Sequence, residues 1–143
     1  IKMKQTILSI SILCTAIFAL TSCTKDKLPA NPTVTEILQQ GKWKITLYTD
    51  NGTDDLFHYT DYSFSFGNGT VAATKTGTTT NGTFTLSNDD DSGVKFILNF
   101  GAVIPFDELN EDWQIIEQTS TKIRLQDISG GHGGTSYLTF EKI

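Results

Sequence analysis

The chain is short of the residues that crosslink a fold or carry out most catalysis. Among its 143 residues are two cysteines, two histidines and three prolines. With so few nitrogen and sulfur ligands, a zinc site is not expected. The sequence has no Gly-x-Ser-x-Gly elbow, phosphate-binding loop or dinucleotide fingerprint. These absences favour a protein that is not an enzyme and that uses no metal and no cofactor.

Positive charge is also scarce. Sixteen acidic residues outnumber eleven basic ones, which gives a formal net charge of −5. Nucleic-acid binding normally needs a basic patch, and anionic lipid headgroups also attract basic segments. The composition therefore argues against a nucleic-acid partner, and any attachment to a membrane should be covalent.

The main apolar run lies near the start of the chain. Lys2 and Lys4 precede a mostly apolar segment over residues 5–20, which ends in small and polar residues. A charged start, an apolar centre and a small-residue end are the three regions of a secretory signal peptide. A transmembrane helix needs about 20 apolar residues, and this run is shorter and is interrupted by serine and threonine. We therefore predict that residues 1–22 are a signal peptide.

The end of this run resembles a bacterial lipobox. Leu20-Thr21-Ser22-Cys23 has the leucine, the two small residues and the cysteine in order, whereas Cys14 lies inside the apolar run. The resemblance implies that the Cys23 thiol receives a diacylglyceryl group and that Cys23 begins the mature chain. Two acyl chains hold a protein stably to a membrane. The expected location is the cell envelope, at the outer membrane, on its periplasmic or its surface side.

One domain is expected after the anchor. Without the signal, 121 of the 143 residues remain, which is enough for a single core without disulfides. Residues 23–33 are polar and proline-bearing and predict a lipidated tether. Residues 34–143 should form the folded domain. A short helix is expected over residues 35–40, capped by Thr35 and ended by Gly41.

From residue 41 onward, apolar residues recur at every second position. The alternation occurs in eight short segments, each with one apolar face, and this pattern predicts β-strands. One-sided strands at this spacing indicate an antiparallel sheet that curls or stacks to bury its apolar side. In the first strand, Trp43, Ile45 and Leu47 should face inward. Tyr48 should face outward.

Asn-Gly pairs mark several expected turns. Asn68-Gly69 and Asn81-Gly82 are signals for type I′ hairpins, and Asn51-Gly52 marks another turn. The longer connection over residues 101–111 joins the fifth and sixth strands. Within it, residues 105–109 predict a helical turn.

Short connections between consecutive strands favour an up-and-down meander. We predict an all-β fold, an eight-stranded antiparallel up-and-down barrel, with a β-sandwich as the alternative. A long first connection before tight hairpins resembles the lipocalins, and Gly41-Lys42-Trp43 matches their Gly-x-Trp. The closest resemblance is to small lipocalin-like lipoproteins of Bacteroidota. It implies that Gly41 and Trp43 close one end of the barrel. Lipocalins often place a basic residue over that tryptophan, after the last strand, whereas Arg124 lies on the seventh strand.

Aromatic residues dominate the predicted inward face. Small eight-stranded barrels can close over a filled core, and large rings favour that outcome. The alternative is a cleft at one end that accepts a small apolar ligand, with Tyr62 and Trp113 as polar handles. The candidate ligand-binding residues are Tyr62, Phe64, Phe66, Phe96 and Trp113.

Acidic clusters are the remaining candidates for chemistry. Asp89, Asp90 and Asp91 could hold a hard cation, but their spacing is not that of an EF-hand. A glycosidase needs two carboxylates across a cleft, and those of residues 107–112 share one loop. His132 lies between glycines in an expected hairpin loop. We therefore predict no catalytic residue and no metal ligand.

Two functions remain compatible with the sequence. The first is a tethered binding module for a small hydrophobic or amphipathic molecule. The second is a structural or interaction lipoprotein, whose filled barrel docks on another envelope protein through Tyr48, Ile97 and Ile116. The sequence leaves the oligomeric state open.

Overall fold

The computed structural model describes residues 32–89, 93–128 and 134–143. The predicted signal peptide, Cys23, most of the tether and the loop residues Asp90, Asp91 and His132 lie outside the described residues. No helix in the described part of the chain is long and apolar enough to cross a bilayer.

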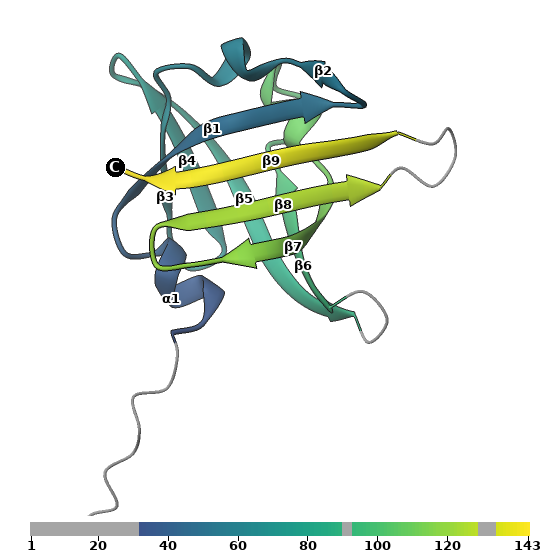
Figure 1. Ribbon diagram of the computed structural model, residues 1–143. Coiled ribbons are helices and arrows are strands. Elements are labelled where there is room, and N and C mark those ends of the chain that lie inside the picture. Colours follow the sequence, from purple (N-terminus) through teal and green to yellow (C-terminus); the bar gives the residue numbers. More distant parts are fainter. Residues whose placement is uncertain (1–31, 90–92, 129–133) are drawn as a thin grey trace, which may run out of the picture. The chain divides into compact units, whose positions relative to one another are not determined.

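The described residues form a closed antiparallel β-barrel (Figure 1). Each strand from β3 to β8 pairs with the next one along the chain. The first strand, β1, pairs with β3 on one side and with β9 on the other, which closes the barrel. Eight strands make the barrel, and the short β2 attaches to the end of β1. The prediction of an up-and-down barrel is confirmed. The elements are α1 (Val34–Leu38), β1 (Lys42–Asp50), β2 (Thr53–Asp54), η1 (Leu56–Tyr59), β3 (Ser63–Phe66), β4 (Thr70–Lys75), β5 (Thr78–Asp89), β6 (Gly93–Asn99), η2 (Phe106–Leu109), β7 (Asp112–Gln118), β8 (Lys122–Ile128) and β9 (Thr135–Lys142).

Aromatic rings fill the barrel interior. The Phe66 ring lies edge-on to those of Phe84, Phe96 and Phe140, with centroids 5.3, 6.0 and 5.5 Å away. Phe64 meets Phe140 in the same way at 5.4 Å. Such edge-to-face pairs stabilise a core beyond the area that they bury. The predicted inward aromatics are buried, apart from the half-buried Tyr62: Trp43, Phe64, Phe66, Phe84, Phe96, Phe100, Trp113 and Phe140.

A β-bulge changes the inward face of β1. The register against β9 shifts between Ile45 and Leu47. Because a bulge sets two residues opposite one, it reverses the alternation that follows it. Ile45 points inward as predicted, but Leu47 is 36% exposed and Tyr48 only 2%. The predictions that Leu47 faces the core and that Tyr48 lies on the outer face were wrong.

The short helix α1 begins one residue earlier than predicted. The Thr33 side chain accepts a hydrogen bond from the backbone N–H of Glu36, and the Glu36 carboxylate accepts one from the backbone N–H of Thr33. This reciprocal capping box fixes the start of the helix. The prediction of Thr35 as the cap was wrong, because the capping glutamate lies three residues after Thr33. The predicted helical turn at residues 105–109 is present as η2.

The turns follow the Asn-Gly pairs in part. Asn51-Gly52 has φ values of 48° and 90°, as a type I′ turn requires. At Asn68-Gly69 a turn is present, but positive φ occurs at Gly69 alone, so it is not type I′. The hairpin between β4 and β5 turns at Thr76-Gly77, whose φ values are 48° and 82°.

Asn81-Gly82 lies within β5, where Gly82 pairs with Val71, so the predicted hairpin at this pair was wrong. A Cβ on Gly82 would lie 2.7 Å from both the backbone oxygen of Asn99 and the Phe100 ring. A glycine inside a strand often marks such a close approach. The sequence could not distinguish this packing requirement from a turn.

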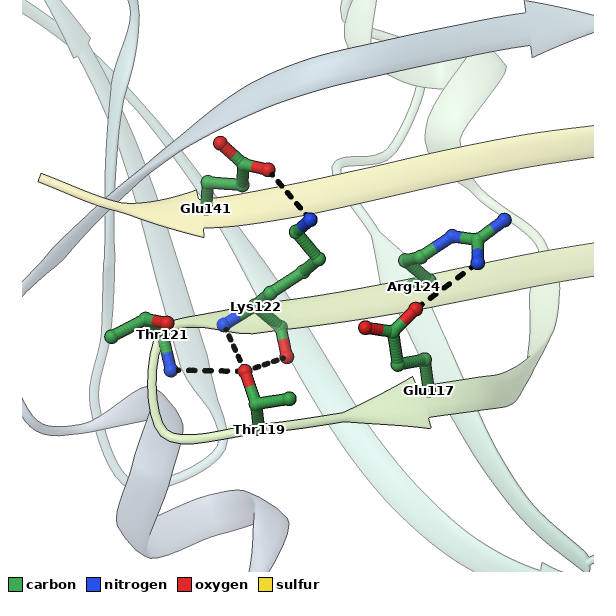
Figure 2. A network of polar contacts seen from close by, with 6 residues as sticks. All are labelled: Glu117, Thr119, Thr121, Lys122, Arg124 and Glu141. Atoms are coloured by element: carbon green, nitrogen blue, oxygen red, sulfur yellow. Dashed lines mark hydrogen bonds and ion pairs between the residues drawn. The ribbon is translucent and has the colours of Figure 1, made fainter.

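A polar network covers the outer face of β7, β8 and β9 (Figure 2). Arg124 pairs with Glu117 at 3.0 Å, and Lys122 pairs with Glu141 at 3.2 Å. The Thr119 hydroxyl accepts hydrogen bonds from two backbone N–H groups of the β7–β8 turn. These partly exposed pairs contribute little energy each, and they place Arg124 outside the barrel.

We predict that Gly82→Ala destabilises the barrel by about 1–3 kcal/mol, because its methyl group would overlap Phe100 and the backbone of Asn99. Urea denaturation measures the change. The matched control is Asn81→Ala on the same strand, at an exposed position, which should stay within about 0.5 kcal/mol of the parent. Equal stability of both variants would contradict the close-approach explanation.

Candidate functional site

One end of the barrel is built around Trp43. This fully buried residue pairs with Phe64 of β3 on one side and with Lys142 of β9 on the other. Its indole Nε1 donates a hydrogen bond to the backbone oxygen of Leu38 at 2.9 Å. Trp43 therefore joins α1, β1, β3 and β9 at one point.

Lys142 covers the tryptophan ring. Its Nζ lies 5.8 Å from the ring centre, a distance at which a cation is attracted to an aromatic face. Gly41 has φ +113°, and a Cβ there would lie 3.1 Å from the Lys142 side chain. Glycine thus supplies the backbone conformation and leaves room for the lysine. Sequence reasoning considered Arg124 as the basic residue over the tryptophan and missed Lys142. The one feature that could have identified Lys142 is its position at the end of the last strand.

The five candidate ligand-binding residues do not share one cavity. Phe64, Phe66 and Phe96 belong to the packed core and are 0%, 6% and 0% exposed. Trp113 lines a pocket, and the half-buried Tyr62 lines a separate groove. A ligand inside the barrel would have to displace the three phenylalanine rings. The pocket and the groove are therefore the candidate sites.

The pocket has a volume of about 240 Å³. It is lined mainly by residues near the ends of β1 and β8 and the starts of β7 and β9, so it lies at the other end of the barrel from Trp43. Several of its donors are already engaged within the fold. The Tyr48 hydroxyl donates to the backbone oxygen of Glu108 at 3.1 Å, and Ser136 Oγ donates to Asp50 Oδ1 at 2.9 Å. The lining residues are Tyr48, Asp50, Asn51, Glu108, Glu111, Trp113, Asp127 and Ser136.

Carboxylates dominate the electrostatics of this pocket. Partial burial, then the charges of Asp127, Asp112 and Asp50, raise the pKa of Glu111 above its ordinary value of 4.5. Within residues 32–89, 93–128 and 134–143, no group of three or more His, Cys, Asp or Glu side chains is arranged to hold a metal ion. With Asp50, Glu108, Glu111 and Asp127 in its lining, the pocket is acidic.

The groove lies in the barrel wall between β1 and β3 and has a volume of about 480 Å³. It exists because the β1–β3 ladder is short: it has only two residue pairs, Lys42 with Ser65 and Trp43 with Phe64. Beyond Trp43 the two strands separate. The lining residues are Lys44, Ile45, Thr46, Leu56, Tyr59, Thr60, Asp61, Tyr62, Ser63 and Ile143.

Two tyrosines, Tyr59 and Tyr62, hold in place the side of the groove that faces β1. The Tyr59 hydroxyl donates to the backbone oxygen of Pro105 at 2.8 Å, and burial is the largest cause of its strongly raised pKa. It therefore stays protonated and remains a donor. The Tyr62 ring lies edge-on to Phe106 at 5.1 Å, with Lys75 Nζ 5.3 Å from its centre. These contacts tie η1 and the start of β3 to η2.

The fold and its cavities define an eight-stranded antiparallel β-barrel with an acidic end pocket and an amphipathic groove in its wall. No known family model matches the chain, and a search of curated proteins finds no significant similarity.

We predict that Glu111→Gln raises stability at neutral pH and has little effect in acid. A carboxyl whose pKa is raised on folding contributes stability that is present below its unfolded pKa, near 4.5, and lost as the pH rises through the folded value. The gain should be small, because the side chain is largely exposed. Urea midpoints at pH 7 and pH 3.5 measure it.

The control is Asp107→Asn, which removes a carboxylate of the same connection that does not line the pocket. A gain for Glu111→Gln that is as large at pH 3.5 as at pH 7 would exclude ionisation as the cause.

Proposed function

We propose that the protein is a lipid-anchored lipoprotein of the cell envelope, held at the outer membrane through Cys23. We further propose that its barrel is a non-enzymatic binding module for a small hydrophobic or amphipathic ligand. The lipobox-like segment before Cys23 supports the anchor. The groove between β1 and β3 is the observation that supports binding.

The groove suits such a ligand better than the barrel interior does. The interior is occupied by phenylalanine rings in direct contact, so opening it would cost packing energy. The groove is already open and is lined by Ile45, Leu56 and Tyr62. Apolar walls with a few polar groups are typical of small-molecule sites.

The charges beside the groove favour an amphipathic ligand over a purely apolar one. Lys44 lies on the β1 wall and Asp61 on the opposite wall. Asp61 pairs with Lys75 at 3.8 Å, whereas Lys44 has no ion pair in the described part of the chain. Apolar parts of such a ligand would lie along Ile45 and Leu56, and an anionic group would meet Lys44.

The second candidate is an interaction lipoprotein that docks on another envelope protein. The filled interior favours it, and so does the apolar side chain of Ile116 on the outer face, which is 41% exposed. Ile97 is half-buried on the same kind of face. Tyr48 no longer belongs to such a surface because it points inward, and the exposed Leu47 takes its place.

The anchor predicts that Cys23→Ser abolishes incorporation of labelled palmitate and releases the protein from the membrane fraction. The reason is that the thiol is the nucleophile that receives the diacylglyceryl group, whose acyl chains carry the label. Cys14→Ser is the control and should leave both labelling and fractionation unchanged. Labelling that survives in Cys23→Ser would overturn the anchor.

Binding in the groove predicts that Ser63→Trp weakens binding of a fluorescent fatty acid at least about tenfold, because an indole would occupy space that the ligand needs. Fluorescence titration of the full-length protein in lipid nanodiscs, corrected for empty nanodiscs, measures this affinity. Ser65→Trp is the matched control on the same strand, with the same half-buried position, outside the groove. Equal affinities of the two variants would argue against this site.

A further inference from the structure

At the groove, β1 has a residue whose backbone N–H and C=O have no partner on the neighbouring strand β3. Successive residues of an antiparallel strand direct their N–H and C=O groups to opposite neighbours. The backbone oxygen of Lys42 accepts a hydrogen bond from the N–H of Ile143, beside β9, at 2.9 Å. Trp43 therefore directs its backbone groups toward β3. Ile45, two residues further along, directs its own to the same side.

On the β3 side, the ladder stops one rung before Ile45. Its last pair is Trp43 with Phe64, and continued register would set Ile45 opposite Tyr62. Both residues line the groove instead. In the residues that the structure describes, no strand pairs with Ile45 on this side, and β2 joins the same edge of β1 only at Thr49.

The unpaired backbone groups of Ile45 are confined rather than open to bulk solvent. Ile45 is 5% exposed and lines the groove, so a new partner for its N–H and C=O on the β3 side would have to lie in the groove. A confined donor and acceptor without partners cost free energy. A hydrocarbon tail in the groove would leave both groups unsatisfied, whereas another peptide backbone would satisfy both.

We propose that the occupant of the groove is a short extended peptide segment of a partner protein, which pairs with β1 at Ile45. Addition of a strand to an open sheet edge is a recurring mode of peptide recognition. Here it would continue the existing β1–β3 ladder. The inference rests on the proposed binding at this groove and names the class of ligand.

The groove walls define the side chains that such a peptide needs. Alternate residues of an extended chain point to opposite faces. Inward residues would contact Ile45, Leu56 and Tyr62, so they should be aliphatic. An outward residue beside the exposed Lys44 should be acidic, because this lysine has no ion pair among the described residues. The expected ligand alternates aliphatic and polar residues and carries an acidic one.

The test uses a set of five-residue peptides, acetylated and amidated, with valine, isoleucine or leucine at positions two and four and glutamate or threonine at the others. Fluorescently labelled peptides are titrated into the full-length protein, and anisotropy gives the affinity. Ser63→Trp should weaken binding at least about tenfold, and Ser65→Trp should not. In further peptides, the backbone nitrogen of the central residue or of a residue next to it is methylated. Where the methylated N–H would have donated a hydrogen bond to β1, binding should weaken about tenfold, because that hydrogen bond is lost.

N-methylation is the readout that separates strand pairing from simple apolar contact. Alternate N–H groups of the peptide face away from β1. Methylation at odd-numbered or at even-numbered positions, but not at both, should therefore weaken binding. Equal loss at odd-numbered and even-numbered positions, or no loss at either, would overturn strand addition. If no peptide of the set binds while the fluorescent fatty acid does, the peptide inference fails and the proposed function stands. If neither binds, both fail.

Discussion

Closure of the barrel depends on β1, because this strand must pair with both β9 and β3. Trp43 is the point at which it does so. The residue is fully buried, pairs to both sides and donates its indole N–H to α1. Gly41 makes room for Lys142, which covers the ring. Much of the architecture at this end follows from seating one large side chain where two sheet edges and a helix meet.

Most of the fold could be predicted from the sequence, because one-sided alternation is a property of the chain itself. All eight predicted barrel strands are present in the described residues. The errors have local physical causes. The bulge after Ile45 is set by pairing with β9, which no single strand encodes. The glycine of Asn81-Gly82 serves a contact with Phe100 from another strand, and in sequence it is identical to a turn glycine.

The candidate site was less predictable than the fold. Alternation located the inward residues Phe64, Phe66 and Phe96, but it could not show that their rings fill the centre. The groove arises from a ladder that ends early, and the residues on its two walls lie about fifteen positions apart in the chain. The alternation pattern identifies Tyr62 as a candidate ligand-binding residue. For Ile45, which lines the opposite side of the groove, it predicts only an inward-facing position.

The two-pair ladder between β1 and β3 also makes the barrel mechanically uneven. β8 and β9 are held by pairs along their full lengths, from Lys122 with Glu141 to Ile128 with Thr135. Local opening starts where few backbone bonds must break, so the barrel should open along the β1–β3 contact while the β8–β9 ladder stays paired. A force applied to the domain through α1 would act first on Trp43, which bonds α1 through its indole N–H and forms the last residue pair between β1 and β3.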